Sequence, residues 1–335
     1  SHTCVSLLEK KYKIIILDSN VNSSVLTVKK IEEIFVNNNL PFQEIIFKKG
    51  DIRDQIFLRS IFFDAIKRDS PINAVIHFAG LKSVKDSISE SIKYWETNVA
   101  GSISLFKIME EFKCFNIVFS SSATVYGNVK NDLISESEKI SPINPYGNNK
   151  ATTELILQDL FNSKVNNWKI ANLRYFNPIG AHPSGLIGED PLQKPNNLFP
   201  LITRVAIGQY KYLTIFGDDW PTPDGTCIRD YIHVMDLANA HTATLEYLLD
   251  NKPQVINLNI GTGIGTSVLE LVKYFQSTNG CNIPYKFSSR REGDVSKLVA
   301  DNKLALSLLD WNPVKNISDM CKDGYLWQKN EISRF

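Results

Sequence analysis

The stretch Ile117-Val118-Phe119-Ser120-Ser121-Ser122 joins a short apolar run to three serines, and it is the clearest indication of the fold class. Similar apolar runs occur at Lys13–Leu17, Glu44–Phe47, Ala74–Phe78 and Trp168–Tyr175. Stretches with helical spacing separate them, at Leu26–Asn39, Arg53–Lys67, Ser91–Glu111 and Asn144–Asn162. Short strands that alternate with such helices predict an α/β fold, a doubly wound parallel sheet with helices on both faces.

The sequence changes character after about residue 177. Residues 177–200 form a loop rich in Pro, Gly and Asn that is longer than an ordinary connection. Shorter elements follow, with strands near residues 213–216 and 255–258 and helices near residues 234–249 and 267–277. We therefore predict a Rossmann-like domain over residues 1–176 and a smaller mixed α/β domain over residues 177–335, some of whose segments return to the first domain.

The composition excludes several classes of protein. The 335 residues carry 37 Lys and Arg against 36 Asp and Glu, a net charge of +1, which argues against a nucleic-acid binder. Hydrophobic residues make up 43%, an ordinary globular value. The five cysteines include no Cys-x-x-Cys pair, and the histidines show no metal spacing, so we expect no metal site. Without an apolar run or a signal pattern we expect a cytoplasmic protein that does not bind membranes.

Polar and glycine residues follow four of the predicted strands, at Asp18, Asp51, Phe78–Lys82 and Ser120–Ser122. Ligands of open parallel sheets bind at the carboxyl ends of the strands. The sequence therefore predicts a ligand cleft along this edge.

Tyr146 and Lys150 form a Tyr-x-x-x-Lys pair on a predicted helix, where residues four apart share one face. A nearby ammonium favours the phenolate and would lower a tyrosine pKa that is about 10 in water, producing a general base. The pattern alone could be an incidental surface pair. Ser122 changes the interpretation, because it ends a strand upstream and could share a hydrogen bond with the same substrate hydroxyl. We predict Ser122, Tyr146 and Lys150 as catalytic residues.

Serine, tyrosine and lysine in this order resemble the proton-handling set of the short-chain dehydrogenase/reductase superfamily. Longer strings then resemble the UDP-glucose 4-epimerase family over nearly the whole chain: His77–Lys82, Ser120–Gly127, Leu173–Pro178, Gly180–Gly185, Gly188–Pro191, Pro195–Leu198, Arg229–His233 and Arg290–Asp294. Several strings in the right order are a far more specific signal than any one of them.

The resemblance also implies a departure at the amino end. Members of the family begin with a strand and a loop, Gly-x-x-Gly-x-x-Gly, whose amides hold the NAD pyrophosphate. Ser1-His2-Thr3 resemble the residues just after that loop. We therefore expect a sheet that lacks a central strand and a weakened pyrophosphate site. Gly261–Gly265 resembles a turn of the family's second domain, and we do not expect it to replace the loop.

NAD is the cofactor that the resemblance implies. Asp18 matches the carboxylate that binds the adenosine ribose, and Asp51 with Ile52 matches the adenine site; by itself, Asp51 reads as a helix N-cap. The matched cofactor residues are Asp18, Asn22, Ser23, Asp51, Ile52, Phe78, Ala79, Gly80, Lys82, Asn98, Tyr146, Lys150 and Phe176.

UDP-glucose and UDP-galactose are the implied substrates. The matched substrate residues are Ser122, Tyr146, Asn177, Asn197, Leu198, Thr214, Ile215, Phe216, Arg229, Arg291, Asp294 and Leu298. Guanidinium groups suit a diphosphate, although Arg290–Glu292 alone reads as a solvated charge cluster. Phe216 offers an apolar wall for uracil, and Leu298 matches a position that limits the size of the sugar.

The implied reaction interconverts the two sugars. Tyr146 takes the proton of the 4-hydroxyl while hydride passes from C4 to NAD, and the 4-keto sugar turns before hydride returns. The family also suggests a homodimer. One alternative is a 4,6-dehydratase, which would carry an acidic pair after Ser122, where this chain has Ala123-Thr124. The other alternative is an inert chain, because of the absent loop.

Overall fold

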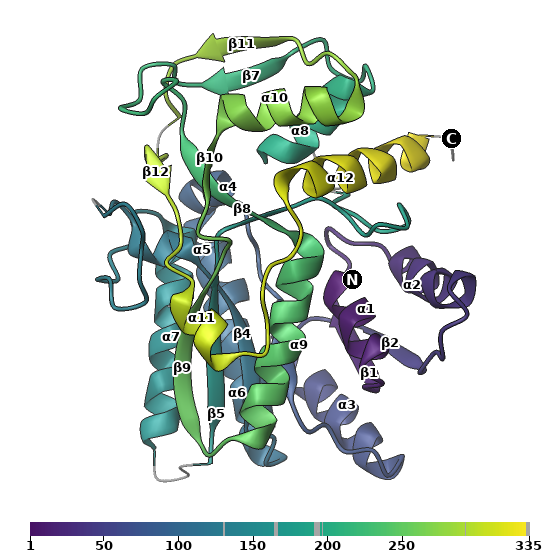
Figure 1. Cartoon of the computed structure of the whole chain (residues 1–335). Coiled ribbons are helices and arrows are strands. Elements are labelled where there is room, and N and C mark those ends of the chain that lie inside the picture. Colours follow the sequence, from purple (N-terminus) through teal and green to yellow (C-terminus); the bar gives the residue numbers. More distant parts are fainter. Residues whose placement is uncertain (130, 164–166, 191–194, 196, 292, 333–335) are drawn as a thin grey trace.

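The computed structural model describes residues 1–129, 131–163, 167–190, 195, 197–291 and 293–332 (Figure 1). One four-stranded sheet is entirely parallel and contains β3 (Val75–His77), β4 (Asn116–Ser122), β5 (Lys169–Tyr175) and β9 (Gln254–Ile260), in that order. β4 pairs with β5 from Asn116 opposite Lys169 to Ser122 opposite Tyr175. β1 (Ile14–Asp18) and β2 (Ile45–Lys49) form a separate parallel pair. The predicted α/β class with parallel strands is confirmed.

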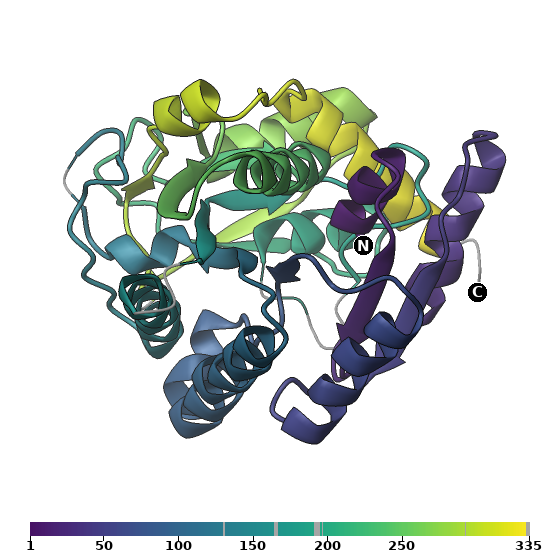
Figure 2. The same cartoon turned by 90° about the horizontal axis from the view of Figure 1, so that it is seen from below.

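Helices cover both faces of this sheet, as the view from below shows (Figure 2). One face carries α3 (Gln55–Lys67), α6 (Gly101–Glu111) and α7 (Pro145–Asn162), and the other carries α1 (His2–Glu9) and α9 (Val234–Asp250). Met109, Ile117 and Trp168 lie in one fully buried cluster on the first face. Leu245 and Leu248 belong to the cluster on the second face. Burying a side chain of this size stabilises the fold by about 1.5–3 kcal/mol.

Two details differ from the expected helices. The stretch Ser91–Glu111 is divided into α5 (Ser91–Tyr94), a π-helical segment η1 (Trp95–Ala100) and α6. The helix α1 was not predicted at all. The remaining helical segments are α2 (Leu26–Asn37), α4 (Val84–Ser89), η2 (Ala123–Tyr126), α8 (Leu198–Ala206), α10 (Val268–Asn279), α11 (Lys303–Leu308) and α12 (Ile317–Ile332).

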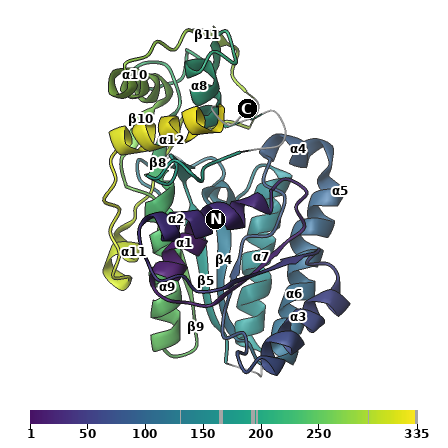
Figure 3. The ribbon, with the colours of Figure 1, turned by 90° about the vertical axis from the view of Figure 1, so that its right-hand side faces the viewer.

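A second group of elements lies at one end of the molecule, where Figure 3 shows β11, α8 and α10 beyond the ends of α6 and α7. β7 (Leu213–Phe216) pairs with β11 (Tyr285–Ser288), and β8 (Ile228–His233) pairs with β6 (Asn177–Ile179), β10 (Gly265–Ser267) and β12 (Lys297–Leu298). Its core includes Ile202, Leu271 and Phe275. β9 comes after residue 177 in the sequence but pairs with β5 of the four-stranded sheet. The division into two domains at residue 177 stays a prediction.

The parallel strands fall into two pieces that a cavity separates. The cavity has a volume of about 1310 Å³, and β1, β3, α1, α3 and α9 all contribute to its lining. Among the described residues, β1 pairs only with β2, and β3 pairs only with β4. The second edge of each strand therefore faces the cavity with backbone groups that no ladder satisfies. The interruption between these two pairs lies between β1 and β3.

This interruption has a measurable consequence for backbone protection. Amides of Ile14–Asp18 and Val75–His77 that face the cavity should exchange with solvent faster than those of Ile117–Phe119, which lie inside the four-stranded sheet. Hydrogen–deuterium exchange followed by mass spectrometry measures the difference. Equal exchange rates in the two sets of segments would contradict this account.

Candidate active site

A large cavity of about 2340 Å³ lies at the carboxyl ends of the parallel strands. Asp18 at the end of β1, Gly80 after β3 and Ser122 at the end of β4 line one side of it. Arg229 and Leu298, from the second group of elements, line the opposite side. The cleft that the sequence predicted is therefore present, and it lies between the two groups of elements.

Tyr146 and Lys150 share one face of α7 and lie next to the end of β4. Asn144 begins the helix, since its side chain accepts the N–H of Gly147 at 2.8 Å. Lys150 Nζ donates to the carbonyl of Ser120 at 2.6 Å and lies 5.7 Å from the centre of the Tyr146 ring. Ser122 Oγ accepts from the N–H of Thr124 at 3.2 Å. The structure thus brings the three predicted catalytic residues together at one strand end.

Burial controls the protonation of this group. It raises the pKa of Tyr146 to about 12, while a hydrogen bond with Ser122 acts in the opposite direction. It also lowers the pKa of Lys150 to about 8, while the charge of Glu154 raises it. The pKa of Tyr146 is therefore raised and not lowered as expected, because the loss of solvation outweighs the hydrogen bond with Ser122.

Asp18 is held in place by its own loop. Its carboxylate accepts the backbone N–H of Asn20 and the hydroxyl of Ser23, each at 2.8 Å. Asn22 and Ser23 line the same part of the large cavity. The three predicted residues of this pocket therefore lie together.

Asp51 forms an ion pair and does not cap a helix. Arg53 donates to it through Nε at 3.0 Å and Nη2 at 2.7 Å. The N-cap of α3 is Asp54, which accepts the N–H of Phe57 at 2.9 Å, so reading Asp51 as the N-cap is wrong. Ile52 is buried and lines the smaller cavity.

Asn98 holds the loop after β3. Its side chain accepts the N–H of Leu81 at 2.7 Å and donates to the carbonyl of Leu81 at 3.0 Å. Gly80 has a φ of +157°, and a Cβ atom there would lie 3.0 Å from Asn98 Oδ1, which explains the glycine. Phe78 and Ala79 line the smaller cavity, and Lys82 pairs with Glu189 at 3.0 Å.

The predicted substrate residues divide into two sets. Those that line the large cavity are Asn177, Asn197, Thr214, Phe216, Arg229, Arg291, Asp294 and Leu298, together with Ser122 and the cofactor residue Phe176. The side chain of Ile215 is 2% exposed and belongs to the core of the second group of elements, and Leu198 packs against that core. Ile215 and Leu198 therefore support the site. Tyr146, the remaining predicted substrate residue, is also not part of the lining of the large cavity and lies beside Ser122 and Lys150.

Comparison with proteins of known sequence shows the family of the chain. The chain is 43% identical to the UDP-glucose 4-epimerase of Bacillus subtilis (strain 168), over 100% of this chain and 95% of that protein. It is 45% identical to the UDP-glucose 4-epimerase of Dictyostelium discoideum, over 98% of this chain and 92% of that protein. The chain belongs to the UDP-glucose 4-epimerase family. Residues 1–324 also match the family described as GDP-mannose 4,6 dehydratase, and the chain belongs to that family as well.

Solved structures of the epimerase family have the same fold. The Stenotrophomonas maltophila UDP-glucose-4-epimerase, with bound NAD and formylated UDP-arabinopyranose, has a TM-score of 0.93 and 40% identity, over 100% of this chain and 96% of that one. The Bifidobacterium longum enzyme, in complex with NAD+ and UDP, has a TM-score of 0.91 and 39% identity, over the same shares. The fold is therefore that of an NAD-dependent epimerase, an isomerase of the extended short-chain dehydrogenase/reductase type.

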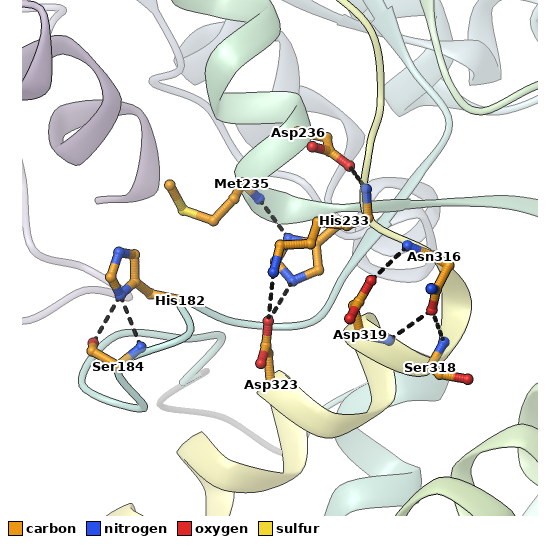
Figure 4. A network of polar contacts seen from close by, with 10 residues as sticks. His182, Ser184, His233, Met235, Asp236, Asn316, Ser318, Asp319 and Asp323 are labelled. Atoms are coloured by element: carbon orange, nitrogen blue, oxygen red, sulfur yellow. Dashed lines mark hydrogen bonds and ion pairs between the residues drawn. The ribbon is translucent and has the colours of Figure 1, made fainter.

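The histidines of this epimerase have structural partners. His77 is 2% exposed, contacts Ser102 Oγ through Nε2 at 2.8 Å and has a pKa lowered to about 3 by burial. In Figure 4, His233 accepts the N–H of Met235 at 3.0 Å and faces Asp323 at 3.2 Å. In the part of the chain that the structure describes, no group of His, Cys, Asp and Glu could hold a metal ion, and no helix is long and apolar enough to cross a membrane.

The turn Gly261-Thr262-Gly263 already has a partner for its amides. The buried carboxylate of Asp230 accepts the N–H groups of Thr262 at 2.7 Å, Gly263 at 2.9 Å and Ala300 at 3.2 Å, and the hydroxyl of Thr262 at 2.7 Å. The turn is thereby tied to β8. This contact is the physical reason that the glycine pattern is no phosphate loop.

Replacing Asp230 by alanine should destabilise the fold by about 2–4 kcal/mol, because three buried or partly buried N–H groups lose their acceptor. Unfolding in urea, followed by circular dichroism, should show a lower midpoint. Asp310→Ala, at an exposed position, serves as the control and should change the midpoint little. A midpoint for Asp230→Ala equal to that of the unmodified chain would contradict this account.

Proposed function

We propose that this epimerase interconverts UDP-glucose and UDP-galactose, with Ser122, Tyr146 and Lys150 as the catalytic residues. The observation that carries the proposal is that Ser122 lines the large cavity at the end of β4, while Lys150 on α7 contacts the same strand end and lies 5.7 Å from the centre of the Tyr146 ring. The names of the relatives support the reaction, since they are UDP-glucose 4-epimerases.

The residues present fit NAD. A carboxylate that its own loop holds lies at the end of β1, where it can accept the ribose hydroxyls, and the loop after β3 has a glycine where a side chain would meet Asn98. Ser1 and Cys4, at the amino end of α1, line both cavities, where N–H groups of a helix end can bind a phosphate. When bound, NAD supplies the reversible oxidation at the sugar's C4.

The proton is handled by residues of this chain. Tyr146 Oη takes the proton from the sugar 4-hydroxyl, and Ser122 Oγ binds the same oxygen. Lys150, fixed by the carbonyl of Ser120, places an ammonium beside the phenol and stabilises its anion. Burial raises the pKa of Tyr146 and the hydrogen bond with Ser122 opposes that effect, so Ser122 favours the anion of the phenol.

The nucleotide end is held more firmly than the sugar. Arg229 and Arg291 reach the cavity from β8 and from the segment after β11, where guanidinium groups can bind a diphosphate. Arg291 now donates to Asp294 at 2.8 Å and lies 5.8 Å from the Phe216 ring centre. Firm binding at this end leaves the sugar free to turn and present its other face.

The dehydratase alternative is not favoured. Ala123 is buried after Ser122, and the hydroxyl of Thr124 donates to Ser122 Oγ at 3.0 Å. Neither of these side chains is a carboxylic acid, so the two positions lack the acidic pair that a dehydratase would use.

We also propose a homodimer that functions in the cytoplasm, in galactose metabolism. Ile92 is 70% exposed on α5, Ile103 is 37% exposed on α6 and Leu155 is 61% exposed on α7, and these helices lie side by side. A second copy would cover such apolar side chains. All five cysteines are free thiols, which suits a reducing compartment.

Replacing Tyr146 by phenylalanine should lower turnover by about 10²–10⁴-fold while UDP binding remains, because only the proton acceptor is lost. Steady-state kinetics and UDP titration measure the two quantities. Tyr274→Phe, on the surface of α10, is the matched control. Normal turnover in Tyr146→Phe would rule out this mechanism.

Leu298 should limit the size of the sugar. It lies opposite Arg229 across the β12–β8 pair and lines the cavity. We expect UDP-N-acetylgalactosamine to be a poor substrate, Leu298→Gly to raise kcat/KM for it by about 10–200-fold, and Leu298→Tyr to abolish it while sparing UDP-galactose. Lys297→Ala, at the adjacent residue, is the control. Equal kcat/KM for both sugars in the unmodified enzyme would show that Leu298 sets no limit.

A further inference from the structure

Glu154 extends the row of side chains that the proposed mechanism uses. Tyr146, Lys150 and Glu154 follow one another at intervals of four residues on α7, so they lie along one face of the helix. Glu154 is only 8% exposed and does not line the large cavity. Its carboxylate instead contacts side chains of β4 and β5, one helical turn beyond the lysine.

The carboxylate of Glu154 has three donors. Arg174, on β5, donates to it through Nε at 3.0 Å and Nη2 at 2.7 Å, and Ser121 Oγ donates to Oε1. The side chains of the ion pair are 4% and 9% exposed. Because desolvation offsets most of the attraction, a buried ion pair is weak evidence for a purely stabilising role.

Ser121 connects this carboxylate to the catalytic group. Its neighbour Ser120 accepts the hydrogen bond of Lys150 Nζ, and its other neighbour is Ser122. Glu154 therefore holds Ser121, the middle residue of the three serines, against α7. Of its two neighbours, Ser120 binds Lys150 and Ser122 is itself one of the proposed catalytic residues. A shift of Ser121 would move both contacts together.

Arg174 is fixed on its other side as well. Its Nη1 donates to Tyr126 Oη at 2.9 Å and to the carbonyl of Glu136 at 3.1 Å. Tyr126 in turn donates to Asn259 Oδ1, on β9, at 2.7 Å. The guanidinium is thus held by α7, η2 and the loop before α7, which leaves the Glu154 carboxylate in a single position.

We propose that Glu154 is a positioning residue for the proton transfer, which keeps Lys150 in its ammonium form and holds Ser121 so that Ser122 and Lys150 face Tyr146. This inference rests on the proposed roles of Tyr146 and Lys150. Glu154 touches neither the substrate nor the reacting atoms, and it acts through the lysine and the serine.

The groups around Lys150 explain why the charge matters. The titratable groups on the elements packed around it include His77 on β3, Tyr94 on α5, Tyr146 and Glu154 on α7, and Arg174 and Tyr175 on β5. Lys85 and Asp86 on α4, Glu96 on η1 and Tyr126 on η2 lie on the other elements that contact α7. Burial lowers the pKa of Lys150 to about 8, and the charge of Glu154 opposes that effect. Without the carboxylate, Lys150 loses its proton at a lower pH, so activity that needs the ammonium fails earlier as the pH rises.

The test is the pH dependence of kcat for the NAD-loaded enzyme and its variants. Glu154→Gln keeps the size of the side chain and removes the charge, and it should move the basic limb of the profile down by about one pH unit. KM for UDP-glucose should change less than twofold. Glu154→Asp, which retains the charge, should keep the limb closer to its original position. Ser121→Ala removes one hydrogen bond and no charge, and it should lower kcat at every pH without moving the limb.

A second variant controls for loss of stability in Glu154→Gln, because that substitution leaves Arg174 buried without a counter-charge. The double variant Glu154→Gln/Arg174→Gln removes both charges and should show the same shift of the basic limb. An unmoved limb in the double variant, or an equal shift in Ser121→Ala, would overturn the proposal. Tyr146→Phe in the same assay tests the proposed function separately. If Tyr146→Phe is inactive but the basic limb of the Glu154 variants does not move, only the role of Glu154 fails.

Discussion

The contact between α7 and the carboxyl end of β4 is the constraint on which the active site depends. Lys150 Nζ donates to the carbonyl of Ser120, and the next turn of the helix binds Ser121 through Glu154. These two contacts fix the rotation of α7 relative to the strand, and the rotation decides where the Tyr146 ring lies. Parallel pairing of β4 with β5 then places Arg174 where it can hold Glu154. The catalytic geometry is therefore a property of strand pairing as much as of three side chains.

Two buried carboxylates have the same task in different parts of the molecule. Asp230 gathers N–H groups from the turn at Gly263 and from Ala300, which brings β8, the turn and the segment after β12 together beneath the nucleotide side of the cavity. Glu154 gathers donors from β4 and β5 on the catalytic side. A carboxylate with several donors can stay in a core that would reject an isolated charge, and in return it fixes segments that are far apart in sequence.

The sequence predicted the features that depend on local pattern. Alternating strands and helices predicted the parallel sheet, the spacing of Tyr146 and Lys150 predicted their common face, and Asp18 was expected at a strand end. The contacts of Glu154 with Arg174 and of Asp51 with Arg53 were not predicted. The contact of Glu154 with Arg174 depends on tertiary packing, which a local pattern does not show. The contact of Asp51 with Arg53 was not predicted because Asp51 was read as the N-cap of α3, a position that Asp54 occupies. The helix α1 was missed because His2–Glu9 has no acidic residue in its first turn and no capping side chain.

The pKa values show what folding alone cannot supply. The same burial that orients Tyr146 and Lys150 opposes the charged form of each, raising the pKa of Tyr146 and lowering that of Lys150. In the proposed mechanism the hydrogen bond with Ser122 favours the phenolate and the charge of Glu154 favours the ammonium, so each group has one neighbour that opposes the effect of burial. Glu154 can act in this way at little further cost in solvation, because it is already desolvated and already paired.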